Sequence, residues 1–386
     1  DGTTDPIDHA DYPDRIEAIP QDSGGGEEGP WRPSDWPDIE AIVDADVQAG
    51  YTYKYIYLIA DDYSYVDLSI GSGRTAFKTS DGAFYTTTTQ HTWDTSKDFP
   101  CSEGYKTRGV IVYTASENQD ASLPYEVLWV DSGSEQFGKS GFSNKRRLRG
   151  VTGEFQQLTS ASSMFNYCYS LTKLPDVLDL SECTTASYMF GNCYSLTKLP
   201  DVLDLSQCTS TSNMFVYCYS LAKVLDVLDL SRCTYTSNMF SNCHSLTKVP
   251  DILDLSECTN TSNMFSYCSS LTKLPDVLDL SQCTNTSNMF SNCHSLLKTP
   301  QLIVSPTSAA GITFSFSSST RINADHRDSV AAFTGASLTG GMVYHLPTVT
   351  SARTLTLNST IKGLFTTTEQ SDIAAHLTGK NWSLSW

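Results

Sequence analysis

The sequence lacks an apolar run of the roughly 18 residues needed to cross a bilayer, and it is poor in cations. Lys and Arg together number 25 against 43 Asp and Glu, so the formal net charge is −18. Proteins that bind nucleic acid present clustered cations to the phosphates. The composition therefore argues against a membrane-inserted protein and against a nucleic-acid partner.

Motifs of enzymes are also scarce. The sequence contains no His-Glu-x-x-His, Gly-x-Ser-x-Gly or Walker motif, and its seven histidines do not cluster. The segment Gly71-x-Gly73-x-x-Ala76 imitates a dinucleotide loop, but no helical pattern follows it. Tandem acids such as Asp61-Asp62 are usually solvated. We expect no catalytic residue, no cofactor and no metal site, and we predict that the protein is not an enzyme.

The first 50 residues carry much of the negative charge, with 14 acids and 2 bases. Within them, residues 1–36 are rich in Pro and Gly, which disfavours regular structure. Two interpretations stay open, a disordered acidic tail or an arm that orders on an assembly partner. The basic run at 145–149 is either a solvated junction, a partner for this arm or a polyanion site. The chain opens at Asp1 without a basic and apolar leader, so a processed chain or a fragment also stays open.

Residues 37–157 are predicted to form a small β-rich domain. Tyrosines alternate with other residues from Tyr51 to Tyr57, which is the period of a strand. The segments Val110–Tyr113 and Tyr125–Val130 predict further strands in the same way.

An internal repeat is the strongest signal in the chain. The dipeptide Met-Phe recurs every 25 residues, at positions 164, 189, 214, 239, 264 and 289. A fixed period of 20–29 residues with regularly spaced leucines is typical of a leucine-rich repeat solenoid, in which each unit buries its apolar face only by stacking on the next. The sequence predicts such a solenoid over residues 158–300, with degenerate repeats and a cap over 301–386. The expected core residues of one unit are Met164, Phe165, Leu171, Leu174, Leu178 and Leu180.

Shorter elements are predicted around this core. The run Ser187–Cys193 is expected to form a helical turn. Thr366 and Glu369 form a capping-box pattern that predicts a helix to about Leu377. Strands are expected at 312–316, 354–357 and 381–386.

The repeat motif Met-Phe-x-x-Cys-x-Ser-Leu resembles the BspA-like leucine-rich repeat family, and residues 239–246 match it closely. The ending Gly379-Lys380-Asn381-Trp382 is similar to ends seen in that family, and Pro100–Thr107 resembles a leader domain found before such repeats. Leu225 departs from the pattern, because other units have Pro there. Members occur on bacterial surfaces, in some protists and in virion proteins of gut phages. The resemblance implies adhesion or receptor binding, outside a cell or on a virion, rather than catalysis.

Eleven of the twelve cysteines lie in the repeat, in two columns spaced by 15 and 10 residues. This spacing fits no zinc motif. Free Cys packs like a small hydrophobe, so we expect reduced, buried thiols. Disulfides between adjacent repeats would fit the distance range but not obviously the Cβ directions.

Charged residues also recur in columns, one of Lys beginning at Lys173 and two of Asp beginning at Asp176 and Asp179. Like charges about 5 Å apart repel by roughly 1 kcal/mol in water. Interleaved Lys and Asp columns would offset that repulsion. We expect a solvated, salt-bridged face; a calcium ladder between the Asp columns is the alternative.

Aromatic and polar residues vary beside the first cysteine column, where Tyr and Asn alternate strictly at positions 167 to 292. Tyr, Asn, His and Ser are the residues that binding loops favour. An exposed ladder of them could bind a glycan or a protein; a packing ladder without a ligand is the alternative. The candidate ligand-binding residues are Tyr167, Tyr169, Tyr194, Tyr217, Tyr219, His244, Tyr267 and His294.

These observations favour a non-enzymatic recognition protein displayed on a bacterial cell or a phage virion. It would bind a host receptor, glycan or protein through the solenoid, as a cell-adhesion protein or a phage tail protein. The alternative is a structural component of a virion or surface assembly, anchored by the N-terminal arm and the β-rich domain.

Overall fold

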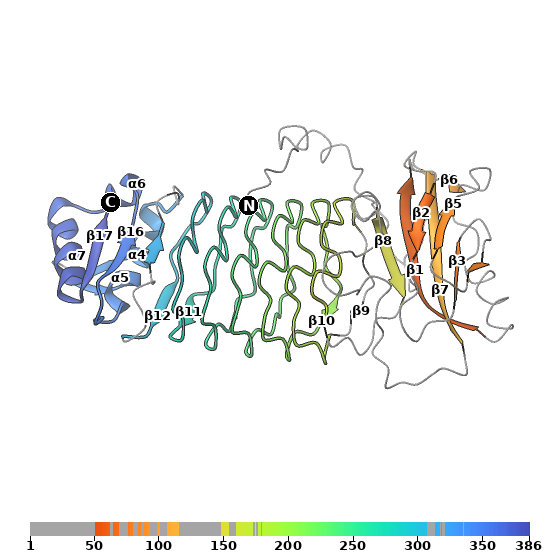
Figure 1. Cartoon of the computed structure of the whole chain (residues 1–386). Helices are drawn as coiled ribbons and strands as arrows, with labels where there is room; N and C mark the ends of the chain where they lie inside the picture. Colours follow the sequence, from red (N-terminus) through yellow and green to blue (C-terminus); the bar gives the residue numbers. More distant parts are fainter. Residues whose placement is uncertain are drawn as a thin grey trace, which may run out of the picture.

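The computed structural model describes part of the chain (Figure 1). The described residues are 51–61, 65–68, 76–79, 84–85, 89–92, 99–100, 106–115, 148–153, 160–306 without 173, 175, 176 and 179, 313–316, 318, 321–334 and 336–386. The predicted acidic arm, the predicted strand at Tyr125–Val130 and most of the basic run lie outside these residues.

Short and long strands make up the described N-terminal part. They are β1 (Tyr51–Asp61), β2 (Tyr65–Leu68), β3 (Ala76–Thr79), β4 (Phe84–Tyr85), β5 (Thr89–Thr92), β6 (Phe99–Pro100), β7 (Lys106–Ala115) and β8 (Leu148–Gly153). One sheet has the order β4-β3-β7-β1-β8, with β6 also on β7, while β2 pairs with β5. The strand that the alternating tyrosines predict is confirmed as β1, and the one at Val110–Tyr113 lies within β7. The division of the chain into domains stays a prediction.

Successive 25-residue repeats lie side by side over residues 160–304, which we call the repeat stack (Figure 1). Parallel pairing joins β9 (Val177–Leu178) to β10 (Val202–Leu203), and β11 (Val277–Leu280) to β12 (Gln301–Val304). Isolated parallel bridges connect Thr185, Ser210, Tyr235, Asn260 and Asn285 in turn. Each partner is therefore the same position of the next repeat. The leucine-rich repeat class of this stack stays a prediction.

The core of the stack follows the predicted pattern. Along β11 the buried Leu278 and Leu280 alternate with the exposed Val277 and the partly exposed Asp279, because successive residues of a strand face opposite sides. Five of the six residues expected in the core of the first unit are fully buried, and Leu174 is partly buried against them.

A column of phenylalanine rings runs through the core. The ring centroids of Phe165, Phe190, Phe215 and Phe240 lie 5.5 Å apart in succession, with nearly parallel planes. Phe265 and Phe290 continue the column, and the ring of Phe316 stacks on Phe290 at 4.9 Å. Because the column continues beyond residue 300, the segment after the regular repeats shares their core.

The expected helical turn at Ser187–Cys193 is wrong. The segment is a succession of tight turns in which the backbone N–H groups alternate between two kinds of partner. The N–H of Met189 donates to Ala186 O three residues back, whereas the N–H of Phe190 donates to Met214 O in the next repeat, at 2.9 Å. This alternation requires left-handed residues, and Tyr188 and Asn192 have φ of 57° and 61°. A helix would leave the next repeat without these bonds.

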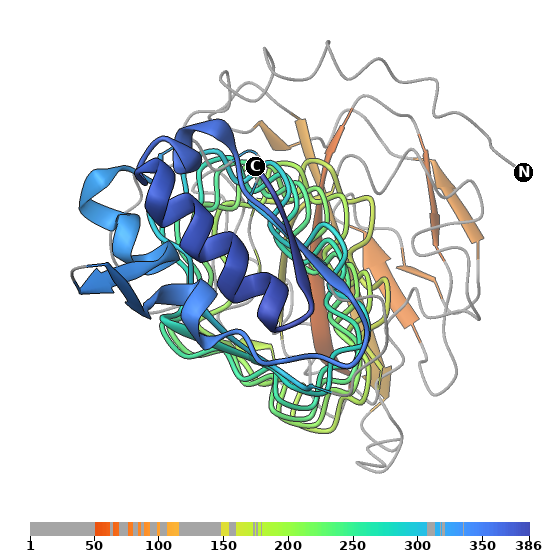
Figure 2. The same ribbon diagram turned by 90° about the vertical axis from the view of Figure 1, so that its left-hand side faces the viewer.

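The C-terminal part closes the end of the stack (Figure 2). Its elements are β13 (Thr313–Ser315), η4 (Ala324–His326), α4 (Arg327–Val330), β14 (Ala332–Thr334), β15 (Ser337–Gly340), α5 (Gly341–His345), β16 (Arg353–Thr356), α6 (Ser359–Lys362), α7 (Thr367–Gly379) and β17 (Trp382–Ser385). Strands β13, β16 and β17 form a parallel sheet in that order. The strands expected near 312–316, 354–357 and 381–386 are confirmed as these three.

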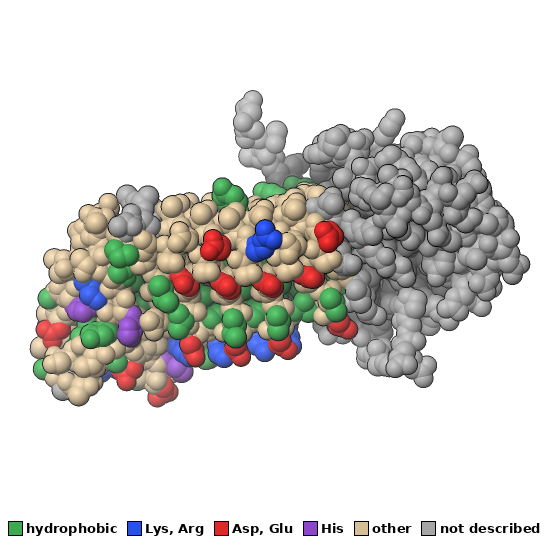
Figure 3. All heavy atoms as spheres, turned by 90° about the horizontal axis from the view of Figure 1, so that it is seen from below, with side chains coloured by type: hydrophobic (Ala, Val, Ile, Leu, Met, Phe, Trp, Pro, Cys, Tyr) green, Lys and Arg blue, Asp and Glu red, His purple; other side chains and the backbone are tan. Residues whose placement is uncertain are grey.

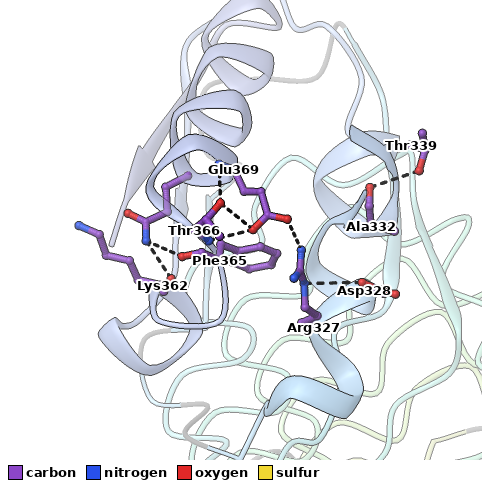
Figure 4. Close-up of polar contacts among 9 residues, drawn as sticks. Arg327, Asp328, Ala332, Thr339, Lys362, Phe365, Thr366 and Glu369 are labelled. Atoms are coloured by element: carbon purple, nitrogen blue, oxygen red, sulfur yellow. Dashed lines mark hydrogen bonds and ion pairs between the residues drawn. The ribbon is translucent and has the colours of Figure 1, made fainter. Parts of the chain in front are cut away.

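Polar contacts fix the C-terminal helix (Figure 4). The predicted capping box is confirmed, since Thr366 N–H donates to the Glu369 carboxylate at 2.8 Å and Glu369 N–H donates to Thr366 Oγ1. The same carboxylate accepts a bond of 2.6 Å from Arg327, whose guanidinium lies over the Phe365 ring. After the helix, Lys380 donates to the Tyr344 and Leu346 carbonyls, both at 2.7 Å. The cap is therefore joined to α4 and α5.

Candidate functional site

The eight predicted ligand-binding residues fall into two columns of the repeat stack. The column that we call the ring ladder contains Tyr169, Tyr194, Tyr219, His244 and His294. The column that we call the left-handed column lies two residues earlier in each repeat and contains Tyr167, Asn192, Tyr217, Asn242, Tyr267 and Asn292.

The first two rings of the ring ladder are buried against each other rather than exposed to solvent. The Tyr169 and Tyr194 rings stack with centroids 4.3 Å apart, and the two residues are only 5% and 7% exposed. Of the two alternatives, the packing ladder therefore describes these two residues, because each ring covers the next. Tyr219 and His244 are half-buried and also stack, at 5.2 Å. Burial raises the pKa of Tyr219 to about 12 and lowers the pKa of His244. His294 is exposed.

The left-handed column is set by the backbone. All six residues have φ between 60° and 66°. Asn enters this region several times more readily than most residues, because its short amide bonds to nearby backbone, whereas a bulky side chain is strained there. Asn at positions 192, 242 and 292 is thus explained by conformation. The sequence pattern alone made this alternation look like surface variation.

Tyrosine in the same column has no such conformational reason. Tyr217 and Tyr267 are exposed, the latter to 49%. The Tyr217 ring meets the edge of Tyr219 at 6.0 Å, and Tyr167 meets Tyr169 in the same way at 6.1 Å. Residue 269 is Ser, so Tyr267 has no matching ring there, and no ring contact joins it to another aromatic residue in the described part of the chain. Its ring faces solvent from a strained backbone.

The cysteines link repeats through weak hydrogen bonds. All eleven thiols of the stack are buried. In one column the thiol donates to a Phe carbonyl of the preceding repeat, as Cys218 does to Phe190 O at 3.1 Å. In the other column, from Cys208 on, it donates to the preceding Cys carbonyl, as Cys233 does to Cys208 O at 3.0 Å. Burial raises the pKa of Cys233 to about 11 and that of Cys293 to about 12. Such thiols are poor nucleophiles and poor metal ligands.

The Lys column forms ion pairs with the first of the two Asp columns, as expected. Lys273 Nζ lies 2.5 Å from Asp251 of the preceding repeat, and Lys248 lies 3.4 Å from Asp226. Lys273 holds the pKa of Asp251 below its usual range. Lys223, with a smaller contribution from Lys248, does the same for the pKa of Asp226. The second Asp column accepts hydrogen bonds from serine N–H groups two residues on, as Asp229 does from Ser231 at 3.0 Å. Within the described residues no group of His, Cys, Asp and Glu is arranged to hold a metal ion.

Residues 184–302 match the family described as "Mycoplasma protein of unknown function, DUF285". The match covers five of the six Met-Phe positions and less than a third of the chain. No curated protein matches the chain. The repeat therefore has counterparts in other proteins, and the finer assignment to BspA-like leucine-rich repeats stays a prediction. None of the helices in the described part of the chain is long and apolar enough to span a bilayer.

Proposed function

We propose that the protein is a non-enzymatic recognition protein, displayed on a bacterial cell or a phage virion, that binds a host receptor, glycan or protein through its repeat stack. The observation that supports this proposal is the presence of exposed tyrosines at left-handed positions. Asn fills the same position in alternate repeats and suits the backbone better. Backbone strain that another residue type would relieve is often found at functional sites.

The spacing of these tyrosines suits a repetitive ligand. Tyr167, Tyr217 and Tyr267 lie two repeats apart, which is about 10 Å if each repeat rises by one strand separation. A tyrosine ring offers an apolar face and a hydroxyl, with little entropy to lose on binding. An extended glycan presents sugar faces at a regular interval, and an extended peptide presents side chains in the same manner.

The fold assignment belongs to the same proposal. The parallel pairing of equivalent positions and the continuous leucine and phenylalanine core support a leucine-rich repeat solenoid of the BspA-like kind. The match to a repeat family at 184–302 agrees with it. Surface display, outside a cell or on a virion, is what that resemblance implies.

The proposal is tested by binding of the labelled full chain to two panels, gut bacteria on one and epithelial cells with matrix proteins on the other. The test variant is Tyr217→Asn with Tyr267→Asn, because Asn occupies this position in three repeats and the fold is kept. The matched control is Tyr235→Asn, an exposed tyrosine of the stack outside the column. Alanine at Tyr169 or Tyr194 would be a poor test, since it would remove buried stacked rings.

We expect the wild type and the Tyr235 variant to bind one panel and the double variant to lose most of that binding. Binding to selected bacteria would favour a phage receptor-binding role, and binding to host cells or matrix would favour an adhesin. Equal binding by the double variant would place the site elsewhere. Binding to neither panel would favour the structural alternative, in which deletion of residues 1–36 abolishes incorporation into the assembly.

A further inference from the structure

A stripe of aliphatic side chains runs along one face of the repeat stack. It is formed by Val202, Val227, Ile252 and Val277, which occupy the same position in four consecutive repeats. Val227 and Ile252 are 79% and 83% exposed. Figure 3 shows this hydrophobic row between two rows of charged side chains. We call it the aliphatic stripe.

Strand conformation alone does not require hydrocarbon at these positions. Thr is also β-branched and is common in strands. The stack uses Thr in another surface column, where the hydroxyl of Thr234 donates to Thr209 O at 3.1 Å and that of Thr284 donates to Thr259 O at 3.1 Å. The chain therefore can place a polar β-branched residue on its surface. Along the stripe it keeps Val or Ile in every repeat.

The two sides of the stripe differ in charge. On one side, the Lys and Asp residues pair with each other, as Lys273 does with Asp251. On the other side, Asp204, Asp229, Asp254 and Asp279 form a column whose printed contacts are with serine. No Lys or Arg within the described residues forms an ion pair with this column. An apolar row therefore lies next to a row of carboxylates that no Lys or Arg of the described residues neutralises.

The repeat spacing matches one kind of partner. Val202 pairs with Val177 of the preceding repeat in adjacent parallel strands, which places equivalent stripe positions about 4.8 Å apart. An α-helix rises about 5.4 Å per turn, so the two spacings differ by less than about 2 Å over three turns. A helix laid along the stack would thus meet one aliphatic side chain at each turn. An extended strand presents same-side residues about 6.7 Å apart and would lose register within a few repeats.

We propose that the aliphatic stripe and the adjoining Asp column bind an amphipathic α-helix whose apolar face is edged by Lys or Arg. The stripe spans about 15 Å, or three turns of such a helix. A second copy of this chain is the less suitable occupant, because each copy carries a formal net charge of −18 and the two would repel, whereas a helix edged by Lys or Arg brings charge of the opposite sign. The proposal uses none of the residues of the ring ladder or the left-handed column, and it does not depend on the proposed function.

The test uses a fluorescent synthetic helix of about five turns with a leucine stripe and lysines along one flank. Its affinity for the full chain is measured by fluorescence anisotropy. Two variants probe the two halves of the surface, Val227→Ser with Ile252→Ser and Asp229→Asn with Asp254→Asn. All four side chains are exposed, so the fold tolerates the changes. The matched control is Tyr235→Ser, which removes an exposed apolar side chain elsewhere on the stack.

We expect the serine pair to weaken binding at least about tenfold. The asparagine pair should weaken it less and reduce its salt dependence, because exposed charges are screened by salt. A peptide of the same composition with a scrambled stripe should not bind. Failure of the wild type to bind the helix, or equal binding by the serine pair, overturns the proposal. A dimer in analytical ultracentrifugation that the serine pair abolishes would overturn it in favour of a second copy.

Discussion

The left-handed backbone of the repeat can be tested by comparing two variants, Tyr267→Gly and Tyr267→Ala. Both variants remove the ring, so their difference reports the main chain alone. Tyr267 has φ of 61°. Forcing a residue with a Cβ into the left-handed region costs roughly 1–2 kcal/mol, whereas Gly elsewhere is less stable than Ala by roughly 0.5–1 kcal/mol. Gly should therefore be favoured over Ala at 267 by about 0.5–1 kcal/mol.

Tyr235 provides the matched control. It is exposed to a similar extent, 53% against 49%, and its φ is not positive. Ala should be favoured over Gly there, so the preference should reverse between the two sites. The double difference is about 1.5 kcal/mol, which is well above the error of a denaturant midpoint.

The free energies are measured by urea unfolding, followed by circular dichroism, for Tyr267→Gly, Tyr267→Ala, Tyr235→Gly and Tyr235→Ala. The slope of the free energy of unfolding with urea concentration must be the same for all four variants, since repeat proteins can lose cooperativity and the free energies would then not be comparable. If Ala is the more stable substitution at both positions, residue 267 is not left-handed. The explanation given for the alternating Asn and Tyr would then fail.

Three further predictions concern the core, the thiols and the cap. Phe240→Ala should cost about 3–5 kcal/mol because the ring is fully buried between two others, whereas Ile252→Ala at an exposed site should cost under about 0.5 kcal/mol, both by urea unfolding. The eleven thiols of the stack should resist iodoacetamide in the native state and react after unfolding, as counted by mass spectrometry; at pH 8 only about one in a thousand Cys233 thiols is ionised. Fast labelling of the native stack would contradict their burial. The pKa of Glu369 is lowered, mainly by the hydrogen bond from the Thr366 N–H and next by the bond from Arg327. The carboxylate therefore stabilises the fold above about pH 4.5, and this contribution to the free energy of unfolding is lost as the pH falls through the lowered pKa. Glu369→Gln should lack that acid-induced loss in urea midpoints measured against pH, and an unchanged profile would show that the contact contributes nothing.

Those features of the fold that repeat or are local could be predicted from the sequence. The 25-residue period places Phe165 and its equivalents at the same point of every repeat, so their burial together follows from the pattern. The capping box at Thr366 is a contact between residues three apart and needs no tertiary information. Both signals can be read from the sequence alone, the first from the 25-residue period and the second from a spacing of three residues.

The features that could not be predicted depend on how neighbouring repeats pack on one another. The period aligns Tyr169 with Tyr194, but it does not say whether the column faces inward or outward. The left-handed residues were missed because Asn and Tyr at one position suggest free variation, whereas the backbone bonds to the next repeat decide the conformation. The sequence also did not show that no described Lys or Arg pairs with Asp229, because this depends on how far the lysines reach across repeats, from Lys273 to Asp251 for example.

The bonds between repeats also determine how the protein would respond to tension. Among the described residues of the stack, each repeat is joined to its neighbours through a row of N–H groups, thiols and stacked rings directed along the stack. A chain pulled from one end would therefore detach in equal steps of one repeat, each releasing roughly 80–90 Å of extended polypeptide. Single-molecule force spectroscopy would record an evenly spaced series of events. A protein built in this way would lengthen under load one repeat at a time while the remaining repeats stay folded.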